Sequence, residues 1–213
     1  MSVHADPGQR DVELALESLL LHPGDHVGVF YRGAEERDAF AIPAIGEALA
    51  AGCAVIYVSD REPTEQVRKL LLAEAIDVDG AVRRGQMQLV SSSEAYLADG
   101  SFDPDRTVDY YRQACQRGRR CGHHSMCIIG EMSWSLRDCP GTERLLEYEA
   151  LYARQSATAD AIALCLYDLE QTGGEQIFDL LRFHSRVLLN GIEMQNPHRV
   201  DPGFFLPGGA YRR

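Results

Sequence analysis

Short apolar runs separated by long intervals constrain the fold of this chain more than any other feature. Several runs are apolar without interruption, which is typical of strands covered on both faces. Each interval is long enough for a crossover helix, and such connections join parallel strands. The pattern therefore predicts an α/β protein with a mostly parallel sheet between layers of helices. The runs are HVGVFY (26–31), CAVIYVS (53–59), MQLVS (87–91), SMCIIGEM (125–132), AIALCLYD (161–168) and VLLNGI (187–192).

The intervals carry helix signals of different clarity. Asp103 and Pro104 form an N-cap followed by proline at the first helical position. Further amphipathic helices are expected from residue 63 and around residues 145–152. In residues 35–51, Pro43 interrupts the pattern, so we expect that helix to begin near the proline or to be kinked there.

We expect one domain of 213 residues, because this length is that of a single sizeable domain. Residues 1–22 form an N-terminal extension in which DVELALESLLL (11–21) predicts an amphipathic helix, packed on the sheet or on a second subunit. Residues 23–195 form the α/β core. Residues 196–213 are rich in Pro and Gly and are expected to be irregular, with residues 204–206 pinning the tail to the core.

The charge balance limits the partners of this protein. It has 21 Lys and Arg against 32 Asp and Glu, a formal net charge of −11. This excess disfavours attraction to nucleic acid or to anionic lipid, so we expect neither partner. The N-terminus lacks the pattern of a signal peptide, and a cytoplasmic location is expected. The chain has six cysteines and no C-x-x-C, which favours reduced thiols over disulfides.

Candidate ligand-binding residues follow from the predicted sheet. In an open parallel sheet, ligands bind beyond the carboxyl ends of the strands, where loops and helix N-termini converge. We expect a small-molecule site there, and His184, in the helix-like FDLLRFHS, could orient the ligand. The other residues at these positions are Tyr31, Arg32, Ser59, Glu62, Glu131, Met132, Trp134, Tyr167 and Asp168.

The turn after the first strand lacks the features of a phosphate-binding loop. A P-loop uses several glycines, a lysine and a Ser or Thr, whereas FYRGAEERDAF has one glycine, no lysine and adjacent glutamates at 35 and 36. Conventional nucleotide hydrolysis is therefore not expected. Glu131 could hold magnesium as in an ATPase, but we favour a carboxylate hydrogen-bonded to loop N–H groups or to an arginine. Trp134 is interpreted equally as a pocket floor or as core.

The segment CGHHSMC (121–127) is the only dense group of soft metal ligands in the sequence. Its candidate ligands are Cys121, His123, His124 and Cys127. Their spacing matches no standard zinc framework, so we favour a polar turn that enters a strand and expect no metal or other cofactor. No G-x-S-x-G motif or Cys/His pair suggests a nucleophile. The sequence therefore does not indicate an enzyme.

The order of these features resembles the MEDS domain, the methanogen/methylotroph DcmR sensory domain. The resemblance covers roughly residues 20–208, and its clearest segments are HVGVFYRGAEE, GQMQLVSSSEAYL, FDPDR, GEMSW, LLEYEALY, ALCLYD and HSRVLLNGIEMQNP. It implies a three-layer RecA/KaiC-like fold without a P-loop, used in sensing and regulation. The family's signature positions would be Tyr31, Glu131, Met132, Trp134, Glu147, Tyr148, Glu149, Tyr167, Asp168, His184, Asn196 and Pro197.

We carry three interpretations of function forward. The first is a non-catalytic sensory domain that binds a small molecule at the carboxyl edge and signals to a regulatory protein, such as a kinase, an anti-sigma factor or a transcription regulator. The second is a degenerate ATPase-like scaffold that acts by assembly, including a homodimer. The third is a nucleotide-binding protein or an atypical hydrolase that uses Glu131.

Overall fold

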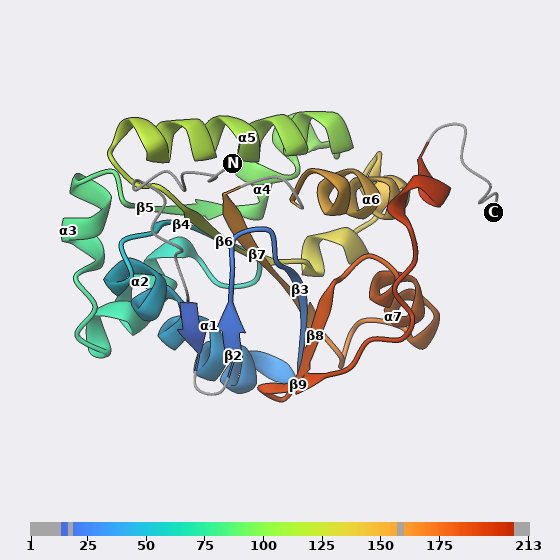
Figure 1. Cartoon of the computed structure of the whole chain (residues 1–213), viewed down its shortest axis with the longest axis horizontal. Helices are drawn as coiled ribbons and strands as arrows, with labels where there is room; N and C mark the ends of the chain where they lie inside the picture. Colours follow the sequence, from blue (N-terminus) through green and yellow to red (C-terminus); the bar gives the residue numbers. More distant parts are fainter. Residues whose placement is uncertain (1–13, 17–18, 157–159, 207–213) are drawn as a thin grey trace, which may run out of the picture.

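A computed structural model describes residues 14–16, 19–156 and 160–206 of the chain. Its centre is a seven-stranded sheet in the order β5-β4-β6-β7-β3-β8-β9, parallel except for the β8–β9 pair (Figure 1). The predicted strands are all present, and the edge strand β9 is additional. The strands are β3 (His26–Tyr31), β4 (Ala54–Ser59), β5 (Met87–Ser91), β6 (Met126–Glu131), β7 (Ala161–Asp168), β8 (Arg186–Leu189) and β9 (Ile192–Met194).

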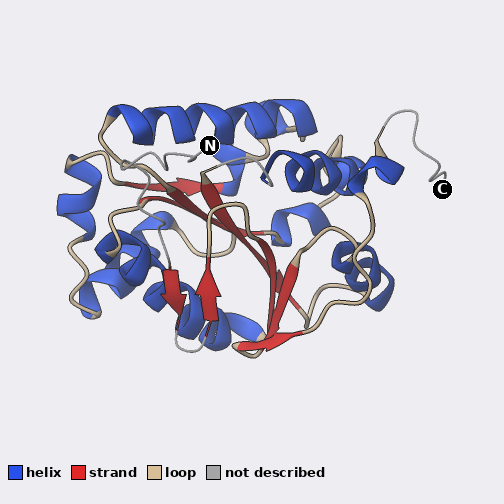
Figure 2. Ribbon diagram, in the orientation of Figure 1, coloured by secondary structure: helices blue, strands red, loops and turns tan. Residues whose placement is uncertain are grey.

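Helices cover both faces of the sheet, which gives the predicted three layers (Figures 1 and 2). One core joins the sheet to α1 (Gly33–Ala50), α2 (Thr64–Ala73) and α3 (Val78–Arg83). The opposite core joins it to α5 (Pro104–Arg120), α6 (Leu145–Ser156) and α7 (Gly174–Leu181). Short helices lie in the loops, namely α4 (Ser92–Ala95), η1 (Ala98–Gly100), η2 (Ser133–Leu136), η3 (Thr142–Arg144) and η4 (Pro202–Phe205).

The expected N-terminal helix is wrong for the part of residues 11–21 that the structure describes. Strands β1 (Leu14–Leu16) and β2 (Leu19–Leu21) pair antiparallel there, while residues 11–13 and 17–18 lie outside the description. In β2, Leu19 and Leu21 are buried and Leu20 is 42% exposed. This alternation is the period of a strand, and so short a helix would gain little stability by itself. The hairpin lies against α1.

Helix α1 begins at Gly33, ten residues before the proline at which we expected it to start or bend. Pro43 lies inside the helix and is exposed, whereas its neighbours Ala41, Ile42 and Ala44 are buried against the sheet. Proline removes one hydrogen bond from a helix. Here the loss falls on the solvent side, and the buried face holds the helix in place.

The C-terminal segment follows the expectation in part. Residues 196–201 form no regular element, and the short helix η4 follows them. The ring of Phe205 lies 4.6 Å from that of Phe183, and Leu206 packs on the same cluster, whereas Phe204 is 51% exposed. Residues 207–213 lie outside the description. No helix in the described part of the chain is long and apolar enough to cross a bilayer.

Two glycines in the loops on either side of β6 form a matched pair that tests how Gly141 packs against Phe102. Gly141 and Gly122 both have a φ of 92°, but a Cβ at Gly141 would overlap the carbonyl oxygen of Phe102, whereas nothing lies within 4 Å of one at Gly122. We expect Gly122→Ala to lower the free energy of unfolding by about 1–2 kcal/mol, and Gly141→Ala by at least about 2 kcal/mol more. Urea denaturation followed by circular dichroism measures both losses, and equal losses would contradict the packing.

Candidate functional site

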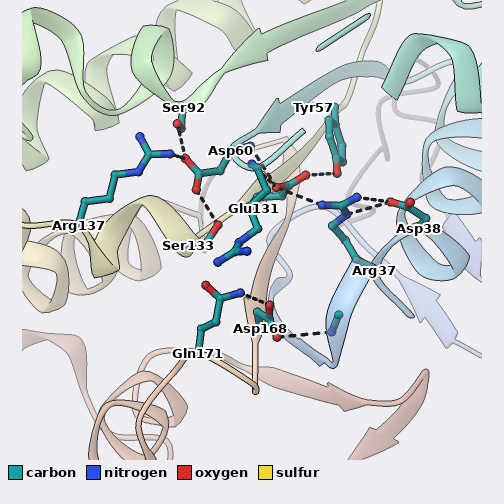
Figure 3. A network of polar contacts seen from close by, with 12 residues as sticks. Arg37, Asp38, Tyr57, Asp60, Ser92, Glu131, Ser133, Arg137, Asp168 and Gln171 are labelled. Carbon is teal, nitrogen blue, oxygen red and sulfur yellow. Dashed lines mark hydrogen bonds and ion pairs between the residues drawn. The ribbon is translucent and has the colours of Figure 1, made fainter. Parts of the chain in front are cut away.

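A buried carboxylate lies at the carboxyl end of β6, an interior strand of the sheet. Glu131 is fully buried. Its Oε1 accepts a hydrogen bond of 2.6 Å from the hydroxyl of Tyr57, and its Oε2 accepts bonds of 3.1 and 3.2 Å from the backbone N–H groups of Asp60 and Arg61 (Figure 3). Glu131 is therefore held by a loop and a neighbouring strand, the arrangement that we favoured over magnesium coordination.

An arginine from α1 supplies the positive charge beside this acid. Arg37 is 2% exposed, and its Nη1 lies 3.6 Å from Oε2 of Glu131. Its Nε and Nη2 also contact Oδ1 of Asp38, both at 2.8 Å. Burial and the charge of Glu131 hold the pKa of Tyr57 well above its usual value, so this hydroxyl remains a donor. The buried charges are thus paired within the protein.

Asp60 forms a second node of the same network. Its carboxylate accepts hydrogen bonds from the hydroxyls of Ser92 and Ser133, the latter at 2.7 Å. The guanidinium of Arg137 lies 2.5 Å from Oδ1 of the same group. Asp60 follows β4, Ser92 follows β5, and the other two residues follow β6. One carboxylate therefore ties together the loops that follow three strands (Figure 3).

Carboxylates also occupy the first turn of α1, where a nucleotide-binding protein would hold phosphate. Oδ1 of Asp168 lies 3.5 Å from the N–H of Gly33, and Asp168 also binds Gln171 (Figure 3). The N–H of Arg32 donates to Oε2 of Glu36 at 2.7 Å. Negative groups at a helix N-terminus are favourable, but here they would repel a bound phosphate. The geometry therefore agrees with the absence of a P-loop in the sequence.

The predicted ligand-binding residues separate into two groups. The first lies along the carboxyl edge of the sheet, where Tyr31 and Ser59 are buried and Arg32 is exposed, with its Nη1 3.4 Å from Oδ1 of Asn190. Glu62 is half-buried in the loop after β4. The members of this group are Tyr31, Arg32, Ser59, Glu62, Glu131 and Asp168.

The second group contributes to the core on the side of α5, α6 and α7. Tyr167 is buried, and its hydroxyl donates to Oε1 of Glu149 at 2.7 Å. His184 is fully buried 5.6 Å from the Tyr167 ring, measured between ring centroids. Met132 and Trp134 belong to the same core. Successive side chains of a strand point to opposite faces, so these residues do not form one site with Glu131.

Trp134 packs in the core on the side of α5 and α6. It is fully buried, and its ring centroid lies 4.5 Å from those of both Tyr96 and Phe102. The stack with Tyr96 is nearly parallel, with an interplanar angle of 19°. The aromatic area of Trp134 thus stabilises this core, as the core interpretation expects.

A cleft of about 410 Å³ lies between α1 and strands β3 and β8. Tyr31 lines it at the end of β3, together with Phe40 and Leu188. The hydroxyl of Tyr31 is buried and has no hydrogen-bond partner in the described part of the protein. Burial, and the charges of Glu131 and Asp168, raise the pKa of Tyr31 above its usual value. The side chain therefore belongs both to the cleft wall and to the electrostatic surroundings of the buried network.

The Cys/His segment 121–127 does not converge on one point. Cys121 and His124 are exposed, while Cys127 is fully buried in β6. Nδ1 of His123 instead contacts the carbonyl oxygen of Gly52 at 3.0 Å. The segment is a polar turn that leads into a strand, as we favoured.

Arg37 was missed at the sequence level, although a signal was present. It lies on the same helical stripe as Ala41, Ala44 and Ala48, all of them buried. A charged residue on a buried stripe requires a partner. The sequence could have revealed this requirement, but not that Glu131 would meet it from a distant strand.

Comparisons with solved structures support the fold. A KaiC-like protein of the hyperthermophilic archaeon Pyrococcus horikoshii matches with a TM-score of 0.60 and 13% identity, over 84% of this chain and 79% of that one. An uncharacterised protein of Pyrococcus horikoshii, solved in complex with an unknown peptide, matches with a TM-score of 0.58 and 14% identity, over 76% and 75%. Identities this low show the fold alone.

Sequence comparison supplies the family. No curated protein sequence matches the chain. The model of the MEDS family, the MEthanogen/methylotroph, DcmR Sensory domain, matches residues 25–185. This range runs from the start of β3 to the residue before β8 and holds both the buried network and the first turn of α1. The chain therefore belongs to the MEDS family of sensory domains.

Proposed function

We propose that this protein is a non-catalytic sensor that binds a small molecule in the cleft between α1 and strands β3 and β8. Tyr31 carries the proposal, because it lines the cleft and its buried hydroxyl lacks a hydrogen-bond partner within the described residues. A cleft of about 410 Å³ has the size of a small-molecule site. Membership of a sensory family supports the same conclusion.

The lining of the cleft suggests the chemistry of the ligand. Val29, Phe40 and Leu188 supply apolar surface, whereas Glu36 and Glu47 supply negative charge. These carboxylates disfavour an anion. We therefore propose a neutral or cationic, largely apolar molecule with one group that hydrogen-bonds to Tyr31.

The position of Tyr31 suggests how binding would be transmitted. The charges of Glu131 and Asp168 act on its hydroxyl. Glu131 contacts α1 through Arg37, and Asp168 contacts α1 through the N–H of Gly33. A ligand that prefers one arrangement of Tyr31 would shift the position of α1 by that difference in binding free energy. A regulatory protein such as a kinase, an anti-sigma factor or a transcription regulator would then distinguish the two states.

Binding in the cleft is tested by filling it from α1. Ala39 lines the cleft, whereas Ala34 is exposed on the same helix outside it. In a panel of small neutral and cationic compounds, we expect at least one to bind wild type saturably in calorimetry. Ala39→Trp should lower the affinity for that compound by at least about tenfold, a loss of about 1.4 kcal/mol of binding free energy. Ala34→Trp should leave the affinity unchanged. Binding by no compound, or equal binding to both variants, would count against the cleft.

Assembly is a second candidate function, favoured by the edge strand β9. All three of its residues are exposed, including Ile192 at 66% and Met194 at 47%. An exposed apolar edge strand is a template for pairing with another chain. On this interpretation, the scaffold acts by forming a homodimer or by pairing with a partner protein.

Sedimentation velocity tests assembly directly. If assembly through β9 is the function, wild type self-associates, Ile192→Lys is monomeric, and Leu72→Lys associates like wild type. Leu72 is the matched control because it is an exposed leucine, at 43%, on the distant helix α2. A wild-type protein that stays monomeric at every concentration would contradict homodimer formation.

Hydrolysis of a nucleotide by Glu131 is the remaining alternative, and the contacts of this acid favour a structural role. We expect no hydrolysis of ATP or GTP with magnesium. Glu131→Gln should lower the free energy of unfolding by roughly 1–3 kcal/mol, because an amide cannot pair with the buried Arg37. The half-buried Glu62 is the control, and Glu62→Gln should change the free energy of unfolding by less than about 0.5 kcal/mol. Hydrolysis by wild type that Glu131→Gln abolishes would establish catalysis instead.

A further inference from the structure

Four potential metal ligands converge in the core on the far side of the sheet from Glu131. His26 begins β3, Cys165 lies in β7, Glu149 lies in α6, and His184 lies in the loop between α7 and β8. Their ligand atoms all lie within 4.8 Å of one another. All four side chains are buried, Glu149 and His184 completely. The tertiary structure thus brings together residues that are up to 158 positions apart, from 26 to 184.

The tautomer of His184 directs an unprotonated ring nitrogen toward this cluster. Nδ1 of His184 lies 2.8 Å from the carbonyl oxygen of Leu180, an acceptor, so we assign the ring proton to Nδ1. Nε2 is then unprotonated, and it lies 3.7 Å from Oε2 of Glu149. A histidine whose second nitrogen donates to a carbonyl is the usual form of a metal ligand.

Two of the atoms that would face the ion lack the hydrogen bonds that burial requires. Oε2 of Glu149 and Nε2 of His184 have no hydrogen-bond partner within the described residues. Leaving such groups buried and unpaired is costly, and each one calls for an explanation. A bound ion would satisfy both atoms at once.

The distances fit ligands around one ion. Nε2 of His26 lies 3.4 Å from Oε2 of Glu149 and 3.4 Å from Sγ of Cys165. Two atoms bound about 2.0–2.3 Å from a tetrahedral metal lie roughly 3.3–3.8 Å apart, a range that includes these two separations and the 3.7 Å between His184 and Glu149. An ordinary hydrogen bond between nitrogen and oxygen is about 2.9 Å long, which is shorter.

The donor set selects the kind of metal. Imidazole and thiolate favour zinc and related transition metals over magnesium or calcium, which prefer oxygen. With Cys165 and Glu149 ionised and both histidines neutral, the ligands carry two negative charges. A divalent ion makes the buried group neutral overall, which removes the cost of isolated charge in the core.

We propose that His26, Glu149, Cys165 and His184 bind one transition-metal ion, with zinc as the expected occupant, in a closed four-coordinate structural site. Binding releases the protons of the Cys165 thiol and of the Glu149 carboxyl group as the metal bonds form. The ion would link β3, β7, α6 and the loop before β8. No open coordination position remains, so the site stabilises the fold and does not activate water.

Neighbouring groups are arranged as supports for these ligands. The hydroxyl of Tyr167 donates to Oε1 of Glu149 and leaves Oε2 for the ion. Gly28 lies beside the ring of His184, and a Cβ there would lie only 3.1 Å from Cγ of the imidazole. Glycine at this position therefore gives the histidine room against the sheet.

Elemental analysis of the whole chain tests the site. Protein produced with added zinc should contain about one zinc ion per chain. Cys165→Ala and Glu149→Gln should lose it, whereas Cys121→Ala and His124→Ala, in the exposed Cys/His turn, should retain it. Refolding wild type with cobalt should give the visible absorption of a tetrahedral thiolate complex, and this absorption should be absent from refolded Cys165→Ala.

A variant that keeps all four ligands guards against loss of metal through misfolding. Tyr167→Phe keeps all four ligands and removes the hydroxyl that donates to Glu149, and we expect it to weaken zinc binding by about 10–100-fold in competition with a chelator. Circular dichroism establishes that each variant is folded. The proposal is overturned if folded wild type takes up neither zinc nor cobalt, or if Cys165→Ala and Glu149→Gln keep the ion. It is also overturned if the turn at 121–127 holds the ion instead.

Discussion

A buried carboxylate that must keep its hydrogen bonds organises the carboxyl edge of this protein. Glu131 is removed from water at the end of the interior strand β6, and a lone charge there would be strongly destabilising. Tyr57, Arg37 and two loop N–H groups meet that requirement. Because these partners come from β4, the loop after β4 and α1, the position of each element depends on the same acid. A pocket beside this network can therefore influence several elements at once.

The two proposed sites lie on opposite faces of the sheet, and β7 has side chains on both faces. Its alternating side chains place Cys165 and Tyr167 in the core beside α6, while Asp168 reaches the first turn of α1. The proposed metal site would fix the first of these layers. The proposed ligand cleft lies in the other, against the helix that follows the first strand of the sheet. If the metal site holds the α6 side of the sheet rigid, a small movement of α1 on the other side could be transmitted without distortion of the whole sheet.

Much of the fold follows from local patterns, and the expectations that were wrong concern features that tertiary packing decides. Uninterrupted apolar runs predicted all the parallel strands, and Asp103 caps α5 as its sequence indicates, by accepting a hydrogen bond from the N–H of Arg106. The hairpin near residue 20 was mistaken for a helix because a short leucine-rich segment fits both periods, and contact with α1 decides between them. The start of α1 was expected too late in the chain, because the exposure of Pro43, and so the low cost of its missing hydrogen bond, depends on how α1 packs.

The sequence by itself determined the layered α/β architecture, the family resemblance and the loss of a phosphate-binding turn, since these depend on neighbouring residues or on regular spacing. Tertiary structure alone decided which side chains meet. It paired Arg37 with Glu131, placed Tyr167 and His184 on the opposite face of the sheet from Glu131, and brought Glu149 beside His26. Such contacts depend on strand order, on which face each side chain points to and on helix orientation. A linear sequence does not specify these quantities until the whole core has packed.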